Sequence, residues 1–377
     1  MTPPRRLRVL MTTDAVGGVW TYASALSRAL CQRGFEVVLV TLGPVPREDQ
    51  IQSLDGVPGL TIEPTDLALE WIDPQGLDVA RARERLNAIE RRVQPDVVHL
   101  NSYREATGDW RSPVLVVAHS CVRTWWRACR GVDPDEPRWL VYVDNVAAGL
   151  SAADRWLAPT AAFRDTIAAL YRPVTEGVVI WNGIDAPSPR RHKQPFILAA
   201  GRLWDEAKNV EMLAHVAPRV PWPIRAAGPA GEPAHSGVLP PGVEAVGELP
   251  HGALLGLMRH ASVLAAPAVY EPFGLTVLEA AASGCALVLS DIATFRELWD
   301  GAALFIDARD EAAWQAILTH VTNNAALRED LQRRALRHAP RYSLATMTDG
   351  YAGLYEELAT QVGRHRTRQE PMLEVRA

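Results

Sequence analysis

Short apolar runs alternate with amphipathic stretches along nearly the whole chain, a pattern that predicts βα units built on parallel sheets. Strands of a first sheet are predicted at residues 8–11, 37–41, 97–100, 114–118, 155–158 and 178–181. These are continuous runs of Val, Leu and Ile, as expected for strands that are covered on both faces. Residues 20–32 carry apolar side chains on one stripe and predict the first crossover helix.

The pattern breaks near Asn182, where glycine and prolines surround a basic cluster at 190–193, and this stretch is the predicted linker. Strands of a second sheet are predicted at 196–200, 224–227, 243–246, 262–266, 286–290 and 303–306. The predicted fold class is therefore α/β, with two Rossmann-like parallel-sheet domains facing each other across a cleft. We place the domains at 1–185 and 186–342. Residues 343–377 add a helix, from Ser343 to about Val362, and a tail.

Charge and hydropathy exclude several classes of protein. A net charge of -5 argues against a general nucleic-acid binder, because neutralising phosphates needs a surplus of Lys and Arg. The basic clusters at 190–193 and 364–368 are short, and we interpret them as solvated charge runs in the linker and the tail. No run of about 18 apolar residues predicts a membrane span, and the first apolar run is too short for an export signal.

The four cysteines have neither CxxC spacing nor the Cys/His spacing of a zinc site. Cys31 and Cys285 lie in apolar contexts and are expected to be small buried hydrophobic residues, whereas Cys121 and Cys129 carry no motif. This usage fits a reducing cytoplasm.

The most informative motif runs from Glu271 through Pro272, Phe273 and Gly274 to Glu279. It follows a predicted strand and opens an Ala-rich helix, so that free backbone N–H groups at the helix start form an anion site. The two carboxylates can grip vicinal hydroxyls on either side of a bound phosphate, the layout of a sugar nucleotide. The alternative is a capping glutamate followed by a glutamate on a solvated helix face.

With this motif the chain resembles the large family-4-like (GT4-like) group of retaining glycosyltransferases, which have the GT-B fold. The resemblance covers nearly the whole chain and is clearest from Gly201 to Asp307. Glu271 and Glu279 match the group's Glu-x7-Glu motif, which implies contact with the transferred sugar for the first and with the nucleotide ribose for the second. The amides around Phe273, Gly274 and Leu275 would hold the diphosphate and sugar. The motif looks most like that of sucrose-phosphate-synthase-type or mannosylfructose-phosphate-synthase-type members.

Two further loops match the group and follow predicted strands. Arg202 and Lys208, in the loop that begins at Gly201, offer a planar fork of donors and a point charge, both suited to a diphosphate. In the group this pair neutralises charge on the leaving nucleotide diphosphate. Gly17 and Gly18 follow the first strand without the GxGxxG fingerprint of dinucleotide binding. In the group that loop lies under the donor phosphates, and the alternative is a plain βα turn.

Other candidates follow strands of the first domain. His119 matches the histidine that contacts the sugar's primary hydroxyl in the group, although Ser120 stands where the group often has Asp. Asn101 and Tyr103, with His99 beside them, are expected to reach the acceptor. Trp125 and Trp126, flanked by arginines, suit stacking on an acceptor sugar or anchoring at a lipid interface, with core packing as the alternative.

The resemblance implies a metal-independent hexosyltransferase with no cofactor, its substrates being a nucleotide-diphosphate sugar and a sugar, glycan or lipid-linked acceptor. Glucose and mannose are the favoured hexoses, in the cytoplasm or at the inner face of the membrane. The final helix is expected to cross back onto the first domain, and ligands are expected to draw the domains together. A nucleotide-sugar epimerase on the same fold and a non-enzymatic sugar-nucleotide-binding protein are the alternatives. The base, the hexose, the acceptor, the linkage and the oligomeric state stay open.

Overall fold

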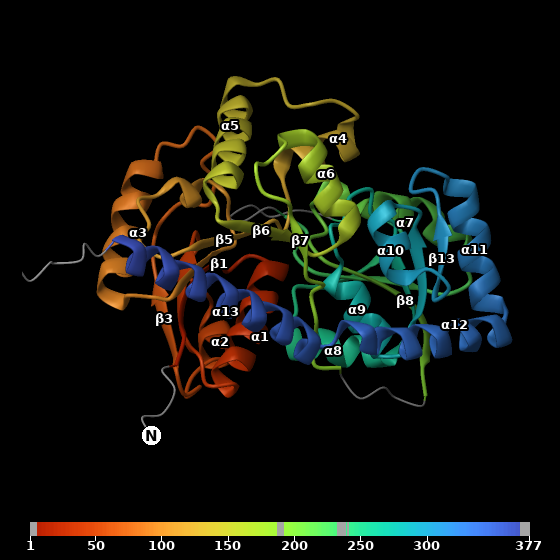
Figure 1. Cartoon of the computed structure of the whole chain (residues 1–377). Helices are drawn as coiled ribbons and strands as arrows, with labels where there is room; N and C mark the ends of the chain where they lie inside the picture. The colour runs from red at the N-terminus through yellow and green to blue at the C-terminus, as the bar shows by residue number, and fades with distance from the viewer. Residues whose placement is uncertain (1–5, 187–191, 232–238, 240, 370–377) are drawn as a thin grey trace, which may run out of the picture.

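The structure, a computed structural model, describes residues 6–186, 192–231, 239 and 241–369. Two parallel sheets, one of seven and one of six strands, form two halves that lie side by side, each with helices on both faces of its sheet (Figure 1). Both sheets of the predicted α/β fold are therefore present. Residues 187–191, in the middle of the predicted linker, lie outside the described residues, and they include Arg190 and Arg191 of its basic cluster.

The first sheet has the strand order β3-β2-β1-β4-β5-β6-β7. Its strands are β1 (Arg8–Asp14), β2 (Glu36–Leu42), β3 (Leu60–Pro64), β4 (Val97–Leu100), β5 (Val114–Val117), β6 (Arg155–Ala158) and β7 (Val178–Val179). The helices between them are α1 (Gly18–Gln32), α2 (Glu48–Gln52), α3 (Val79–Val93), α4 (Val122–Arg130), α5 (Pro137–Ala152) and α6 (Ala161–Tyr171), with a 3-10 turn η1 (Arg104–Thr107). The sequence missed β3, an edge strand that pairs only with β2 and whose residues are exposed or half-buried.

The second sheet has the order β10-β9-β8-β11-β12-β13. Its strands are β8 (Gln194–Ala200), β9 (Ile224–Ala227), β10 (Glu244–Gly247), β11 (Ala261–Ala266), β12 (Ala286–Ser290) and β13 (Ala303–Ile306). The helices are α7 (Val210–Val216), α8 (His251–His260), α9 (Leu275–Ala282), α10 (Ala293–Trp299), α11 (Glu311–Asn323) and α12 (Ala325–His338), with 3-10 turns η2 (Glu206–Lys208), η3 (Ala217–Arg219) and η4 (Ala339–Tyr342). Every predicted strand of this half is present within about two residues, the usual scatter of element ends.

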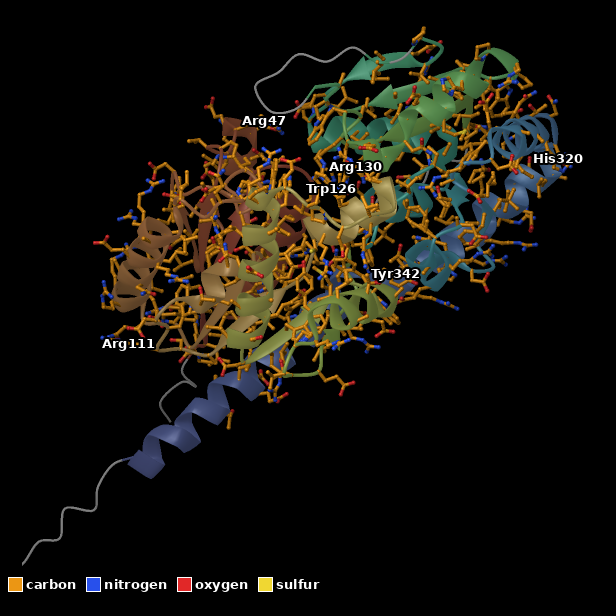
Figure 2. All side chains as sticks on the ribbon, turned by 90° about the horizontal axis from the view of Figure 1, so that it is seen from above. Arg47, Arg111, Trp126, Arg130, His320 and Tyr342 are labelled. Carbon is orange, nitrogen blue, oxygen red and sulfur yellow. The ribbon has the colours of Figure 1, made fainter. Side chains whose placement is uncertain are left out.

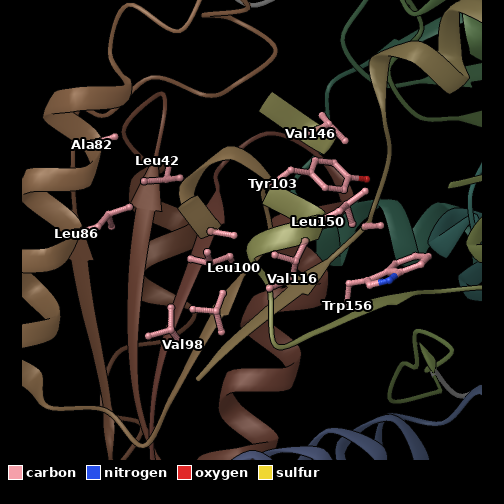
Figure 3. Packing of buried hydrophobic residues seen from close by; sticks show 14 of the residues in the cluster. Leu42, Ala82, Leu86, Val98, Leu100, Tyr103, Val116, Val146, Leu150 and Trp156 are labelled. Carbon is pink, nitrogen blue, oxygen red and sulfur yellow. The ribbon is translucent and has the colours of Figure 1, made fainter. Parts of the chain in front are cut away.

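Buried apolar residues fill both faces of the first sheet. On one face, side chains from β2, β4 and β5 meet those of α3 and α5, as Figure 3 shows for Leu42, Leu86, Val98 and Val116 among others. On the other face, α1 packs against α13 (Leu344–Gln369). The continuous apolar runs therefore became strands covered on both faces.

The last helix, α13, leaves the second half and runs along the first (Figure 1). Met347, Tyr351, Leu354, Tyr355 and Leu358, the apolar stripe, are all buried in the cluster that includes α1. The helix also continues to Gln369, so the basic cluster at 364–368 belongs to a helix rather than to the expected tail.

The two places where the chain crosses between the halves are bonded to each other. Ile184 accepts a hydrogen bond from the amide of Leu344 (3.0 Å), and its own amide donates to the carbonyl of Tyr342 (3.2 Å). A Cβ on Gly183 would lie 2.2 Å from the carbonyl oxygen of Ser343, so the two crossings approach closely enough to require glycine. The two connections thus form a single junction.

Candidate active site

Lys208 and Glu271 meet at the carboxyl ends of β8 and β11, where ligands bind in open parallel sheets. The Nζ of Lys208 forms an ion pair with Oε2 of Glu271, with the two side chains 22% and 19% exposed. The hydroxyl of Thr294 donates to the carbonyl oxygen of Glu271 (2.6 Å) and fixes the loop. The structure therefore brings together a cation and a carboxylate that are 63 residues apart in the chain.

The start of α9 lies next to Glu271. Gly274 is in the left-handed region (φ 85°), and a Cβ there would lie 3.1 Å from Phe295 and 3.3 Å from Glu271. No side chain caps the helix, so the amides of Leu275 and Thr276 have no side-chain partner. Anion binding at this helix start stays a prediction. Phe273 is buried in the core beneath the turn and anchors it.

A cavity of about 30 Å³ lies under this loop, lined in part by Lys208, Glu271 and Thr276. A cavity of that size holds one or two water molecules and is far too small for a hexose. A hexose bound by Glu271 would therefore lie outside this cavity.

Arg202, in the loop that follows β8, lies close to the glycine loop of the first half. Its guanidinium donates to Oδ2 of Asp205 (2.7 Å), and its side chain is 40% exposed. A Cβ built on Gly17 would lie 3.9 Å from Nη1 of Arg202, and one built on Gly18 would lie 3.8 Å from Leu275. The glycine pair of the first half thus faces Arg202 and the start of α9 with room for little more than one added carbon atom.

The same loop contains Asp14, a residue to which the sequence assigned no role. Its carboxylate accepts a hydrogen bond from the amide of Val16 (2.9 Å). Burial raises the pKa of Asp14 to about 6, although that hydrogen bond and the charge of Arg202 act in the opposite direction. Asp14 therefore titrates close to neutral pH beside the Gly17–Gly18 turn.

Glu279, on the buried face of α9, is only 4% exposed. Its Oε1 accepts a hydrogen bond from Nε2 of His251 (2.7 Å), the first residue of α8. The hydrogen bond to this carboxylate, opposed by burial, raises the pKa of His251 above its ordinary value. No sequence motif identified His251, because the pairing depends on how α8 packs beside α9.

His119 and Asn101 form one hydrogen-bonded group with His99. The Oδ1 of Asn101 lies 2.7 Å from Nε2 of His119 and 3.0 Å from Nε2 of His99, while its Nδ2 donates to the carbonyl of Thr12 (2.6 Å). Because that oxygen only accepts, both histidines carry their proton on Nε2. Nδ1 of His119 is then an acceptor, suited to a sugar hydroxyl.

Burial, with a smaller effect from the neighbouring His99, lowers the pKa of His119 to about 3, so that this partly exposed imidazole is neutral. His99 is fully buried, stacks on Tyr351 and lies 2.6 Å from the hydroxyl of Tyr355. His99 therefore joins α13 to the first sheet rather than facing outward.

The remaining acceptor candidates lie in less open positions. Tyr103 is 2% exposed within the core (Figure 3), and its hydroxyl donates to the carbonyl of Ser120 (2.9 Å). Trp126 is 9% exposed and packs on Trp139. Trp125 donates its indole N–H to Asp205 of the second half (2.9 Å). Contact of these residues with an acceptor stays a prediction.

Several hydrogen bonds join the two halves beside Glu271. The hydroxyl of Tyr270 accepts from the amide of Cys121 (3.0 Å) and lies 2.8 Å from the hydroxyl of Thr124, at the start of α4. On the other side of Glu271, the hydroxyl of Thr160, the N-cap of α6, donates to the carbonyl of Pro272 (2.9 Å). The first half therefore holds the Glu271 loop from both sides, which the sequence did not predict.

In the described part of the chain, no three His, Cys, Asp or Glu side chains gather in a way that could hold a metal ion. Within the same residues, no helix is both long enough and apolar enough to cross a membrane. All four cysteines are free; Cys31, Cys121 and Cys285 are buried and Cys129 is half-buried.

The chain matches two sequence profiles of glycosyltransferases. Residues 16–187 match the sequence profile of Glycosyltransferase Family 4, and residues 194–324 match that of Glycosyl transferases group 1. Glycogen synthase of Mycobacterium tuberculosis is 28% identical over 339 residues, covering 76% of this chain and 78% of that enzyme. The structure is similar to that of sucrose-phosphate synthase from Thermosynechococcus elongatus, with a TM-score of 0.78 and 18% sequence identity. The similarity covers 94% of this chain and 100% of that one. The structure is also similar to that of HepE from Anabaena in complex with UDP-glucose, with a TM-score of 0.73 and 15% sequence identity. That similarity covers 94% of this chain and 100% of HepE. The predicted GT-B fold is confirmed.

Proposed function

Within glycosyltransferase family 4, to which this chain belongs as a retaining glycosyltransferase, we propose that it moves a hexosyl group from a nucleotide-diphosphate sugar to a hydroxyl acceptor. The observation that carries the proposal is the close approach of Gly17 and Gly18 to Arg202 and Leu275 across the two halves. A donor diphosphate at this contact touches backbone from one half and a guanidinium from the other. Glucose and mannose are the favoured hexoses, and the UDP-glucose complex of HepE supports glucose.

We assign the donor site residue by residue. Arg202, Lys208 and the amides at the start of α9 hold the diphosphate, because a planar fork, a point charge and free N–H groups all suit phosphate oxygens. Glu271 accepts hydrogen bonds from the sugar hydroxyls, and Glu279 accepts them from the ribose. His119 accepts one from the sugar's primary hydroxyl through Nδ1, since its Nε2 proton points to Asn101.

The transfer step needs charge stabilisation more than a protein nucleophile. The bond from the anomeric carbon to the diphosphate breaks, and the acceptor hydroxyl attacks the same face of the sugar while its proton passes to a phosphate oxygen. Negative charge grows on the leaving diphosphate, where two cations and a helix start stabilise it without reorganising. A metal ion is not required in this scheme.

The acceptor approaches from the first half, where Asn101, Tyr103, Trp125 and Trp126 are the sequence-based candidates. Asn101 is hydrogen-bonded directly to His119, whereas Tyr103 and Trp126 are buried. A lipid-linked acceptor would also account for contact with the inner face of a membrane.

The test is a panel of nucleotide sugars that differ in the base and carry glucose or mannose. Each is incubated with and without candidate acceptors. Release of nucleoside diphosphate that depends on both one donor and one acceptor, with a new glycoside formed, supports the proposal. Conversion of the donor to its epimer without any acceptor would replace it with the epimerase alternative.

A further inference from the structure

Helix α4 of the first half is bonded to the second half near both of its ends. Its start bonds Tyr270, and near its end the carbonyl of Ala128 accepts a hydrogen bond from Arg309 (3.2 Å). Figure 2 shows Trp126 and Arg130 of this helix at the place where the two halves meet. Trp125 lies between these two anchors, so its position depends on both halves.

The indole of Trp125 is bonded directly to the loop that carries Arg202. Its N–H donates to Oδ1 of Asp205 (2.9 Å), and the other carboxylate oxygen of Asp205 accepts from Arg202 (2.7 Å). The Asp205 side chain is only 5% exposed. Burial opposes its ionisation, but the charge of Arg202 and the hydrogen bond from Trp125 outweigh burial and lower the pKa of Asp205. Asp205 is thus a buried carboxylate whose Oδ1 accepts from Trp125 of the first half and from the amide of Ala207 (3.0 Å), while its Oδ2 accepts from Arg202.

This chain of bonds bears on the orientation of Arg202. The side chain is 40% exposed, and a long arginine side chain has many rotamers to lose when it is fixed. Asp205 fixes one nitrogen of the fork, and Gly17 lies beside the other. The ring of Trp125 is itself held by Arg130, whose guanidinium carbon lies 5.2 Å from the ring centroid.

We propose that Trp125 is a positioning residue that acts through Asp205 to aim Arg202 at the donor diphosphate when the two halves are together. The inference rests on the proposed function and deepens it. It assigns Trp125 to the donor reaction instead of to stacking on an acceptor. Stabilisation of the leaving group then depends on the contact between halves, because separation of the halves breaks the Trp125–Asp205 hydrogen bond and leaves Asp205 with its partners in its own loop.

The distinguishing measurement is slow hydrolysis of the nucleotide sugar with water as the acceptor. Trp125→Phe keeps an aromatic ring but removes the N–H together with the five-membered ring of the indole. Hydrolysis and transfer should both slow by about tenfold, the effect of losing one hydrogen bond to a charged group. The KM of the acceptor should be unchanged. Hydrolysis at the wild-type rate would overturn the proposal, whether or not the acceptor KM rises.

The matched control is Trp139→Phe, in the same aromatic stack. Trp139 packs on Trp126, and its indole nitrogen is buried with no partner, so removal of its N–H should leave hydrolysis and transfer unchanged. A tenfold loss of the hydrolysis and transfer rates in Trp139→Phe as well would overturn the proposal. The loss would then come from disturbing the packed tryptophans and not from the hydrogen bond to Asp205.

Asp205→Asn is a second test of the proposal, and it can be used even if Trp125→Phe does not fold. This variant should slow hydrolysis by at least as much, again with the acceptor KM unchanged. In the Asp205→Asn background, Trp125→Phe should add less than about a twofold effect, since two residues that act through one contact are not additive. Full additivity would overturn the proposal. A wild-type enzyme that neither hydrolyses nor transfers any nucleotide sugar would instead contradict the proposed function.

Discussion

The ammonium of Lys208 is paired with the carboxylate of Glu271, across the ends of two strands in the second half. In the proposed mechanism the two groups have different ligands, because Lys208 binds the diphosphate and Glu271 binds the sugar. The pair therefore holds both side chains at the point where the sugar joins the phosphate. In that mechanism, each group is preorganised for its own part of the donor.

Removal of the Glu271 carboxylate should mainly lower turnover. In Glu271→Gln the sugar loses a contact that holds it in a reactive pose, which typically costs about 10²–10³ in rate. The measurement is kcat and donor KM at saturating acceptor. Glu279→Gln is the matched control, and it should raise the donor KM with a smaller change in kcat. Wild-type turnover in Glu271→Gln would remove Glu271 from the site.

The pairing of His251 with Glu279 should make stability depend on pH. The folded-state pKa of His251 is raised, so its contribution is complete below the unfolded value near 6.5 and is lost as pH rises through the folded-state pKa. The His251 side chain is 52% exposed, which limits the effect to about 1 kcal/mol or less. Urea unfolding should show that wild type exceeds His251→Gln in stability by more at pH 5.5 than at pH 8.5. An equal difference at both pH values would contradict the pairing.

The hydrogen bond between Tyr355 and His99 should contribute to the attachment of α13. Tyr355→Phe removes the hydroxyl and leaves a buried imidazole nitrogen without its partner, which costs about 1–3 kcal/mol. Thermal unfolding should show the loss. Thr360→Ser is a suitable control, since the Thr360 hydroxyl bonds only within α13. Tyr355→Phe with wild-type stability would mean that the bond contributes nothing.

Much of the fold could be predicted because its strands are continuous apolar runs, and strands covered on both faces produce that pattern. Strand β3 could not, since Thr61 and Glu63 interrupt its apolar residues and it pairs on one side only. The sequence likewise placed Arg202, Lys208, Glu271 and Glu279 after strands or in the helix that follows one. Within each motif, local chain geometry largely decides where the side chains lie.

Contacts between segments that are distant along the chain could not be predicted from the sequence. His251 and Glu279 come from neighbouring helices, and the partner of Trp125 comes from the other half of the molecule. Trp125 and Trp126 illustrate the limit most clearly. Their spacing shows that adjacent helical positions face different ways, but only packing decides that Trp126 is buried and that Trp125 contacts Asp205.

Gly183 should tolerate no side chain at the junction of the two crossings. In Gly183→Ala the new Cβ would lie 2.2 Å from a backbone oxygen, so one crossing must move away from the other. We expect a loss of about 1–3 kcal/mol in stability, as for other overpacked positions. Gly353→Ala is the control, because a Cβ there meets nothing within 4 Å. Equal melting temperatures for the two variants would contradict this description of the junction.

The most direct measurement of the central claim is single-turnover transfer at saturating donor by the wild type, Arg202→Ala and Lys208→Ala, with the anomeric configuration of the product read by NMR. The account predicts that each variant is slower by about 10² or more, since each loses a cation that stabilises the leaving diphosphate. It also predicts that Arg202→Lys does not restore the rate, because the fork geometry is lost, and that the product keeps the configuration of the donor. Unchanged rates in both alanine variants would show that the diphosphate binds elsewhere and would contradict the account.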